Sequence, residues 1–329
     1  MKLFAYALRD YDELPFLEAQ SKKLGFEFGW TSEYPGMENA ELARGYDSLS
    51  IITNPLDAEL LARFHDLGVR GISTRTVGYD HIDLAAAEEL GIRVANAPYP
   101  PNGVADYTIM MILMATRKMK LIEEATRYQD FGLKGKIGRP LSSCTVGVVG
   151  TGAIGEAVCR RLKGFGCRIL ANDPYEKESL RGLVEYTTLD ELLAASDIVT
   201  LHAPGLPQNT HMIDAAAFAR MKEGAVLVNA ARGVLIDTAA LIDAVESGHV
   251  GAAALDTIEN EAGLYYHDLS REALPNRDRA VLMSYPNVIV TPHMAFYTDE
   301  AVENMIANSC EALLAFSRGE DSPFEVRTA

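Results

Sequence analysis

Short apolar runs alternate with longer segments of helical spacing along the whole chain. In the first third, residues 2–7, 48–53 and 70–73 are predicted to be buried strands, and the apolar positions of residues 56–67 recur on one helix face. Strands that alternate with helices indicate βαβ units and a parallel sheet. We therefore expect the first third to form a small doubly wound α/β unit.

A second and longer series of strands follows from residue 145 onward. The predicted strands cover residues 145–149, 168–171, 197–202, 225–229, 251–255 and 287–291. Six strands separated by helical segments satisfy what a complete dinucleotide-binding sheet requires. The predicted fold class is α/β, with two doubly wound parallel-sheet domains.

The connection between the two series is stiff and irregular. Residues 96–103 contain three prolines and a glycine, which are incompatible with regular structure, so we place a domain boundary there. The following helix, predicted over residues 104–119, is more apolar than a solvent-facing helix should be. Burial in the core and burial at a dimer interface both explain it. A final helix, residues 298–316, comes after the last strand and is expected to pack back on the first domain.

Composition agrees with a globular protein of two domains. The chain has 329 residues, of which 48% are hydrophobic and 23% charged, and its net charge is −16. This negative field repels nucleic acid and anionic membranes, so neither is an expected partner. An anionic substrate must then meet a locally placed cation.

The cysteines and the apolar runs further restrict the class of protein. Cys144, Cys159, Cys167 and Cys310 form no CxxC pair and no zinc-like spacing with the histidines, so reduced, structural thiols and no bound metal are expected. The apolar runs at the N-terminus and at residues 109–115 are too short for a signal peptide or a membrane span. We expect a soluble, cytoplasmic protein.

The first chemical motif is a glycine-rich turn. Gly150-Thr151-Gly152-Ala153-Ile154-Gly155 lies between a predicted strand and a predicted helix, the context that makes GxGxxG specific. Glycines there allow a tight turn, the approach of a pyrophosphate to the backbone amides of the helix N-terminus, and close packing of helix on strand. Asp173, at the end of the next strand, is placed to accept hydrogen bonds from a ribose diol, which favours NAD over NADP.

Three further motifs follow later strands. Arg232 ends the segment Asn229-Ala230-Ala231-Arg232, and an arginine there can clamp a carboxylate through two parallel hydrogen bonds. Glu261 closes a carboxylate-rich segment that begins at Asp256, and His293 follows Pro292. A carboxylate beside an imidazole keeps the imidazole available as a proton donor near neutral pH. An Arg, a Glu and a His on the ligand side of one sheet therefore indicate an active site.

These motifs together resemble those of the D-isomer-specific 2-hydroxyacid dehydrogenases, and the resemblance covers essentially the whole chain. Residues 73–83, 99–106 and 296–298 are most similar to D-lactate dehydrogenases, including those of vancomycin-resistance gene clusters. The resemblance implies a Rossmann NAD-binding domain of residues 101–298. It also implies a smaller, flavodoxin-like substrate domain of residues 1–100 and 299–329, and a homodimer formed through the nucleotide domain.

The resemblance also implies residue roles. Arg232, Glu261 and His293 match the catalytic residues: Arg232 holds the substrate carboxylate, Glu261 pairs with the histidine, and His293 is the general acid/base. Val77, Gly78, Tyr99 and Arg232 match substrate-binding positions. The implied cofactor contacts are Gly150, Gly152, Ala153, Ile154, Gly155, Asp173, Ala203, Pro204, Asn209, Ala230, Arg232 and Asp256.

The expected activity is the NAD-dependent reduction of pyruvate to D-lactate, and two alternatives stay open. Thr53 stands where some D-lactate dehydrogenases have a tyrosine over the substrate, so a reductase of bulkier acids such as phenylpyruvate or 2-ketoisocaproate is the first alternative. Val234 replaces a proline common in the family, and we attach no function to it. The second alternative is a nucleotide-sensing binding protein like the corepressors that resemble this family. A phosphoglycerate dehydrogenase is disfavoured, because no cationic cluster for a phosphate is evident.

Overall fold

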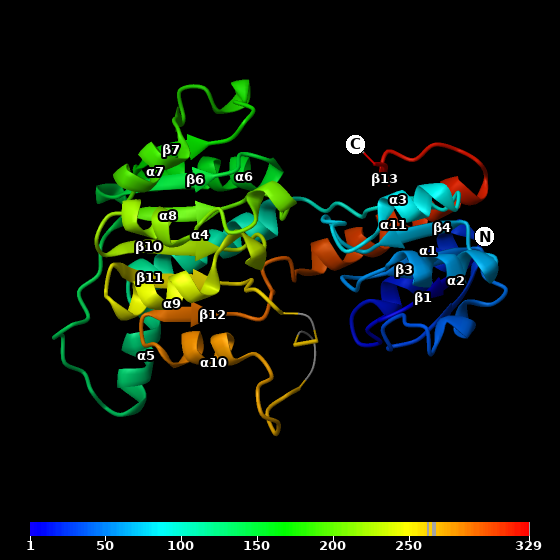
Figure 1. The fold of residues 1–329 in the computed structure, drawn as a ribbon, viewed down its shortest axis with the longest axis horizontal. Helices are drawn as coiled ribbons and strands as arrows, with labels where there is room; N and C mark the ends of the chain where they lie inside the picture. Colours follow the sequence, from blue (N-terminus) through cyan, green and yellow to red (C-terminus); the bar gives the residue numbers. More distant parts are fainter. Residues whose placement is uncertain (262, 265–267, 329) are drawn as a thin grey trace. The chain divides into compact units, whose positions relative to one another are not determined.

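The chain divides into two compact units. The computed structural model describes residues 1–261, 263–264 and 268–328. Unit 1 comprises Met1–Pro100 and Tyr297–Ala329, and unit 2 comprises Pro101–Phe296 (Figure 1). The two units divide after residues 100 and 296. The predicted substrate and NAD-binding domains, divided after residues 100 and 298, stay a prediction.

Unit 1 contains a six-stranded sheet of order β13-β5-β4-β3-β1-β2. Its strands are β1 (Lys2–Ala5), β2 (Glu27–Trp30), β3 (Ser48–Ile51), β4 (Gly71–Thr74), β5 (Arg93–Ala95) and β13 (Glu325–Val326). The first five are parallel, and β13 pairs antiparallel with β5. The order 2-1-3-4-5 is that of a flavodoxin-like doubly wound sheet, so the predicted fold class is confirmed for this unit.

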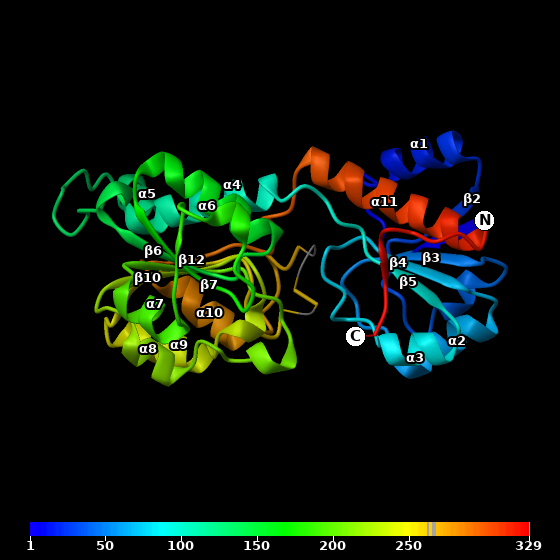
Figure 2. The same ribbon diagram turned by 90° about the horizontal axis from the view of Figure 1, so that it is seen from above.

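Helices cover both faces of this sheet (Figure 2). They are α1 (Leu14–Leu24) and α11 (Asp299–Ser317) on one face, and α2 (Ala58–Asp66) and α3 (Leu84–Glu89) on the other. Side chains of β1 alternate between the two cores: Leu3 packs with Leu17 and Ile306, whereas its neighbour Phe4 packs with the α2 side. The expectation that the last helix packs on the first domain is confirmed, since α11 lies against β3 and β4.

Unit 2 contains a seven-stranded parallel sheet of order β12-β11-β10-β9-β6-β7-β8. The strands are β6 (Thr145–Val149), β7 (Arg168–Asn172), β8 (Glu185–Tyr186), β9 (Ile198–Leu201), β10 (Ala225–Asn229), β11 (Val250–Leu255) and β12 (Val288–Val290). The chain order reverses between β6 and β9, the switch point at which sheets of this kind bind ligands. Six strands were predicted; the two-residue edge strand β8 is too short to leave a pattern in the sequence.

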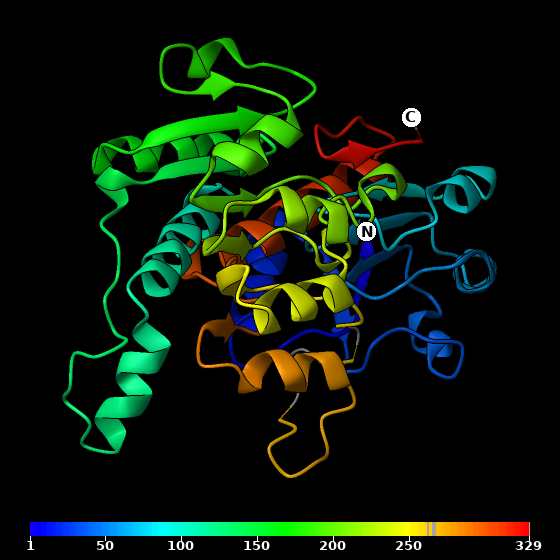
Figure 3. The ribbon, with the colours of Figure 1, turned by 60° about the vertical axis from the view of Figure 1, so that its left-hand side comes forward.

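The sheet of unit 2 is also covered on both faces (Figures 2 and 3). One face carries α4 (Asn102–Thr116) and α6 (Ala153–Leu162), with α5 (Met119–Arg127) beside them. The other carries α7 (Leu189–Ala195), α8 (Ala215–Arg220), α9 (Thr238–Glu246) and α10 (Arg277–Ser284). The fold class is therefore confirmed for this unit as well.

The apolar helix after the domain boundary is shorter than predicted. It ends at Thr116, because Lys118 has a left-handed backbone (φ 53°), and Met119 begins the separate helix α5. Along α4, Met111 and Ile112 are fully buried, and the helix packs on α6, β10 and β11. Burial in the core of its own unit thus accounts for most of its apolar surface.

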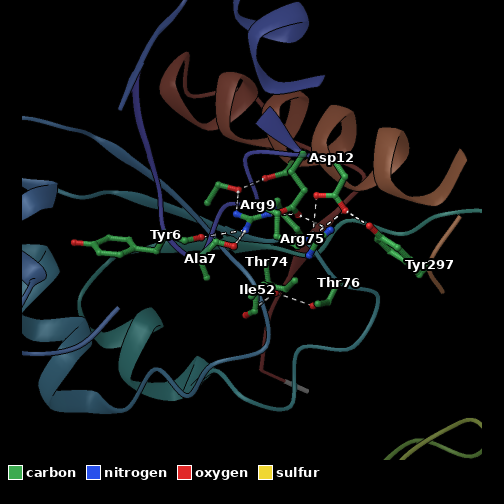
Figure 4. Close-up of polar contacts among 12 residues, drawn as sticks. Tyr6, Ala7, Arg9, Asp12, Ile52, Thr74, Arg75, Thr76 and Tyr297 are labelled. Atoms are coloured by element: carbon green, nitrogen blue, oxygen red, sulfur yellow. Dashed lines mark hydrogen bonds and ion pairs between the residues drawn. The ribbon is translucent and has the colours of Figure 1, made fainter. Parts of the chain in front are cut away.

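A buried ion pair organises the carboxyl edge of the sheet in unit 1 (Figure 4). Arg75, directly after β4, and Glu13, before α1, are both fully buried, and Arg75 Nε donates to Glu13 Oε1 at 2.9 Å. Arg75 Nη2 donates to the carbonyls of Tyr6 and Ala7 at 3.0 and 2.9 Å, and Nη1 donates to Ser50 Oγ at 3.1 Å. One guanidinium thus connects the chain segments that follow β1 and β4 with β3.

We predict that Glu13→Gln destabilises unit 1 by about 3–5 kcal/mol, because it leaves the Arg75 charge buried without its counter-ion. The measurement is urea unfolding followed by the fluorescence of Trp30, the only tryptophan, which lies on β2 of this unit. The control is Glu27→Gln, which removes the exposed pair with Lys2 and should cost less than about 1 kcal/mol. Equal unfolding midpoints for the two variants would contradict a stabilising role for the buried pair.

Candidate active site

The glycine-rich turn after β6 leaves room for a ligand at one position and for nothing at the other two. Gly150 has φ +90°, and a Cβ there would lie 2.7 Å from Ala203 N and from the His202 carbonyl. A Cβ on Gly155 would lie 1.9 Å from the Gly150 carbonyl oxygen. At Gly152, which precedes α6, no atom of the described residues lies within 4 Å of the Cβ position. Of these three glycines, only Gly152 therefore borders open space.

Asp173 lies beside this turn. It follows the last residue of β7, and its Oδ2 accepts a hydrogen bond from Thr151 N at 2.6 Å while Oδ1 accepts one from Tyr175 N at 2.8 Å. A turn open at Gly152, the N-terminus of α6 and a carboxylate bound to the same turn are what the pyrophosphate and ribose of a dinucleotide require. The residues present therefore fit NAD.

The loops after β9 and β10 bound the same edge. Asn209 Nδ2 donates to the carbonyl of Pro204 at 2.9 Å, and this loop also contains Ala203, which is next to Gly150. At the end of β10, the fully buried Asn229 accepts from Ala231 N at 3.0 Å and donates to the Arg232 carbonyl at 2.9 Å. Asn229 thus shapes the turn that carries Arg232, a role that was not predicted from the sequence.

The Arg232 side chain also has defined neighbours. Its Nη1 donates to the carbonyl of Ala231 at 2.9 Å. Its Cγ lies 3.1 Å from the Cβ position of Gly205, so a larger residue in the β9 loop would displace it. Arg232 is thus held at the carboxyl end of β10, next to the buried Ala230.

Glu261 and His293 form a pair. His293 Nδ1 lies 3.0 Å from Glu261 Oε1, and each side chain is 22% exposed. The other Glu261 oxygen accepts from Ile258 N at 3.0 Å. The structure thus brings together a glutamate after β11 and a histidine after β12, which are 32 residues apart in the sequence. With Glu261 on Nδ1, proton transfer at this imidazole would have to use the Nε2 atom.

Asp256 shapes the loop that carries this histidine. It is 1% exposed, its Oδ1 accepts from Thr291 Oγ1 at 2.5 Å and from Met294 N at 2.9 Å, and its Oδ2 accepts from Ala295 N at 2.8 Å. Its carbonyl accepts from His293 N at 2.9 Å, and His293 has φ +53°, which is uncommon for a residue with a side chain. The role given to Asp256 from the sequence was a cofactor contact; its positioning of the loop was missed.

The remaining predicted site residues belong to unit 1. Val77 and Gly78 follow β4, where the Val77 carbonyl accepts from Asn96 Nδ2 at 2.8 Å and the Gly78 carbonyl accepts from Thr76 Oγ1 at 2.5 Å. Thr53 follows β3 at the same edge, and Tyr99 lies near the end of the N-terminal segment of this unit. The structure therefore places these four residues in unit 1 and the Arg, Glu and His in unit 2.

Three further features of the described residues concern the cysteines, metal binding and membrane-spanning helices. All four cysteines are free, and burial raises the pKa of the Cys159 and Cys310 thiols to about 12. Among the described residues, no group of three His, Cys, Asp or Glu side chains could hold a metal ion. None of the helices that the structure describes has the length and apolar character needed to cross a membrane.

Known proteins with this fold and these motifs identify the family. The model of the D-isomer specific 2-hydroxyacid dehydrogenase NAD-binding domain matches residues 109–295. An aromatic 2-oxoacid reductase of Clostridium sporogenes is 41% identical over 309 residues, 93% of each chain. A D-lactate dehydrogenase of Lactiplantibacillus plantarum is 39% identical over 310 residues, again 93% of each. The solved structure of D-2-hydroxyisocaproate dehydrogenase superimposes with a TM-score of 0.88 at 34% identity and covers 100% of both chains.

The chain therefore belongs to the D-isomer-specific 2-hydroxyacid dehydrogenases. It is an NAD-dependent oxidoreductase, as the sequence analysis predicted, and NAD is its cofactor.

We predict that Gly152→Ala weakens NADH binding at least about tenfold without changing the melting temperature. The new methyl group would meet no protein atom of the described residues but would occupy the space where a pyrophosphate must approach the backbone. The measurement is NADH fluorescence titration alongside thermal unfolding. Gly164→Ala, at the other end of the helix and equally uncrowded, is the control and should alter neither quantity. Unchanged NADH affinity in Gly152→Ala would place the pyrophosphate elsewhere.

Proposed function

We propose that this protein is a D-lactate dehydrogenase that reduces pyruvate to D-lactate. The observation that carries the proposal is the His293–Glu261 pair beside the Arg232 turn at the carboxyl edge of a nucleotide-binding sheet. Reduction of a 2-keto acid requires a hydride at carbon, a proton at oxygen and a fixed carboxylate. NADH, when bound, supplies the hydride.

The residues of the chain supply the other two requirements. Arg232 binds the substrate carboxylate through its fork of N–H donors. His293 donates the Nε2 proton to the keto oxygen as the alcohol forms. Glu261, on Nδ1, stabilises the imidazolium before that transfer and keeps the ring oriented. In the oxidative direction, the same imidazole accepts the proton.

A second candidate is a reductase of bulkier 2-keto acids. It is supported by the 41% identity to an aromatic 2-oxoacid reductase and by the small side chain of Thr53 at a position where some D-lactate dehydrogenases have a tyrosine. The two candidates share the chemistry of Arg232 and His293 and differ in the apolar part of the pocket. Pocket discrimination of this kind amounts to about 1–3 kcal/mol per methylene, or roughly 10- to 200-fold.

We predict that the protein oxidises NADH with pyruvate, and that His293→Ala lowers kcat by about 10²–10⁴-fold, the usual contribution of general acid catalysis. The assay follows NADH at 340 nm with pyruvate, 2-ketoisocaproate and phenylpyruvate in parallel. Higher kcat/KM for phenylpyruvate than for pyruvate would select the second candidate. Tight NADH binding without turnover of any keto acid would replace both with the sensing alternative.

We also propose a homodimer formed through unit 2. Residues 128–139, which follow α5, are called the arm here, and Figure 3 shows this segment extending beyond the sheet of its unit. Four of its apolar side chains are highly exposed: Tyr128 (86%), Phe131 (75%), Leu133 (88%) and Ile137 (84%). Beside the arm, a pocket of 510 Å³ lies among Met114, Leu121 and the first residues of several strands. Exposed apolar surface next to an apolar pocket fits a second copy of the same unit.

We predict that Leu133→Asp converts the dimer to a monomer, because a charge in the contact would have to be buried without a partner. The mass is measured by size-exclusion chromatography with light scattering. Leu42→Asp, which charges a 45% exposed leucine of unit 1, is the control and should leave the mass unchanged. A dimer that persists in Leu133→Asp at low micromolar concentration would exclude the arm as the contact.

A further inference from the structure

A second imidazole–carboxylate pair lies close to the first. His211 Nε2 is 2.6 Å from Glu259 Oε1, and the other Glu259 oxygen accepts from Thr238 N at 3.0 Å and from Thr238 Oγ1 at 2.7 Å. Glu259 is two residues from Glu261, on the same turn after β11. The proposed reaction uses neither His211 nor Glu259.

The backbone between the two glutamates is held at several points. Asn276 Nδ2 donates to the carbonyls of Glu259 and Asn260 at 3.0 and 3.1 Å, and Asn260 has φ +55°. Ile258, on the other side of Glu259, donates its N–H to Glu261 Oε2. Each interaction of Glu259 therefore restrains the short segment that directs Glu261 toward His293.

The same segment supports the arginine turn. A Cβ on Gly233 would lie 2.1 Å from the Ile258 carbonyl and 2.6 Å from Glu259 N, so the residue after Arg232 packs directly on this backbone. Movement of the 258–261 turn would therefore reach Arg232 as well as His293. Glu259 links this turn to two other elements, the loop of His211 and the N-terminus of α9.

Hydrogen bonds and nearby charges favour the ionised forms of both members of the pair. The hydrogen bond that His211 donates to Glu259 raises the pKa of His211, and Asp237 and Asp214 add to this effect. Burial acts to raise the pKa of Glu259, but the hydrogen bonds from His211 and Thr238 outweigh it and the pKa is lowered. Both groups are charged at a pH above the lowered pKa of Glu259 and below the raised pKa of His211, and the charged pair is lost as the pH rises through the raised pKa of His211.

We propose that Glu259, held by His211 and Thr238, is a positioning residue for the Glu261–His293 pair. The inference rests on the proposed function for its kinetic consequence, but its geometric consequence needs no substrate. With Glu261 accepting from Nδ1–H, neutral His293 is held in the Nδ1–H tautomer, with Nε2 unprotonated. If the 258–261 turn becomes more mobile, the preference of His293 for the Nδ1–H tautomer weakens.

The test is Glu259→Ala with two readouts. The first is the tautomer ratio of the His293 imidazole, from nitrogen chemical shifts of the 15N-labelled full-length protein, assigned by comparison with His293→Gln. The second is the pH profile of kcat. We expect the Nδ1–H fraction to fall, and kcat to fall by about tenfold, the scale of coupling between neighbours in one network. NADH affinity should stay within about twofold.

The control is Glu246→Gln, which alters a glutamate of α9 whose partner is the Tyr285 hydroxyl and should change neither readout. His211→Gln, at a side chain 42% exposed, keeps a hydrogen-bonding group but removes the charge. His211→Gln should lower the Nδ1–H fraction of His293 and kcat by less than Glu259→Ala does. If Glu259→Ala fails to fold, His211→Gln provides the test of the positioning role. Tautomer ratios and pH profiles like those of the Glu246→Gln control would overturn the proposal. Should the wild-type protein reduce no keto acid, the proposed function fails, and the tautomer ratio alone still decides the positioning role.

Discussion

In unit 2, the loops that leave neighbouring strands touch one another backbone to backbone. Gly150 lies against the β9 loop at His202 and Ala203, and Gly233 lies against the turn after β11. Neither contact leaves room for a Cβ. Because these contacts lie at the carboxyl edge of one parallel sheet, the cofactor turn, the Arg232 turn and the Glu261 turn are fixed relative to one another. The relative positions of the residues in the candidate active site depend on these close backbone contacts.

Three carboxylates of the acidic segment after β11 accept hydrogen bonds from neighbouring loops. Asp256 accepts hydrogen bonds from the loop that carries His293, Glu259 accepts from His211 and Thr238, and Glu261 faces His293 and the amide of Ile258. In the sequence these residues form one acidic cluster. In the structure Asp256 and Glu261 both contact the loop that carries His293, whereas Glu259 contacts the loop of His211 and the N-terminus of α9.

Local patterns predicted the strands of unit 2 that are three residues or longer, the glycine turn and the Arg, Glu and His positions, because each follows from residues close together in the chain. They did not predict β2 and β5 of unit 1, nor β8 and β13, which have two residues each. They also missed Arg75 with Glu13 and Glu259 with His211, whose partners are 62 and 48 residues apart. Such pairs exist only once the sheet has brought their loops to one edge. Roles inferred from a family resemblance, such as a cofactor contact for Asp256, likewise say nothing of the hydrogen bonds within the protein that support the site.

Unit 1 cannot complete one of its two cores during synthesis until α11 has been translated. Unit 2 is contiguous, whereas unit 1 needs Ile306 and Leu313 of α11 for one of its two cores, and Ser309 for the hydroxyl contact to Ser50 beside Arg75. On the ribosome residues 1–100 emerge before unit 2, but they lack this helix until residues 299–317 have been translated. Unit 2 can therefore fold while unit 1 still exposes one apolar face of its sheet to chaperones.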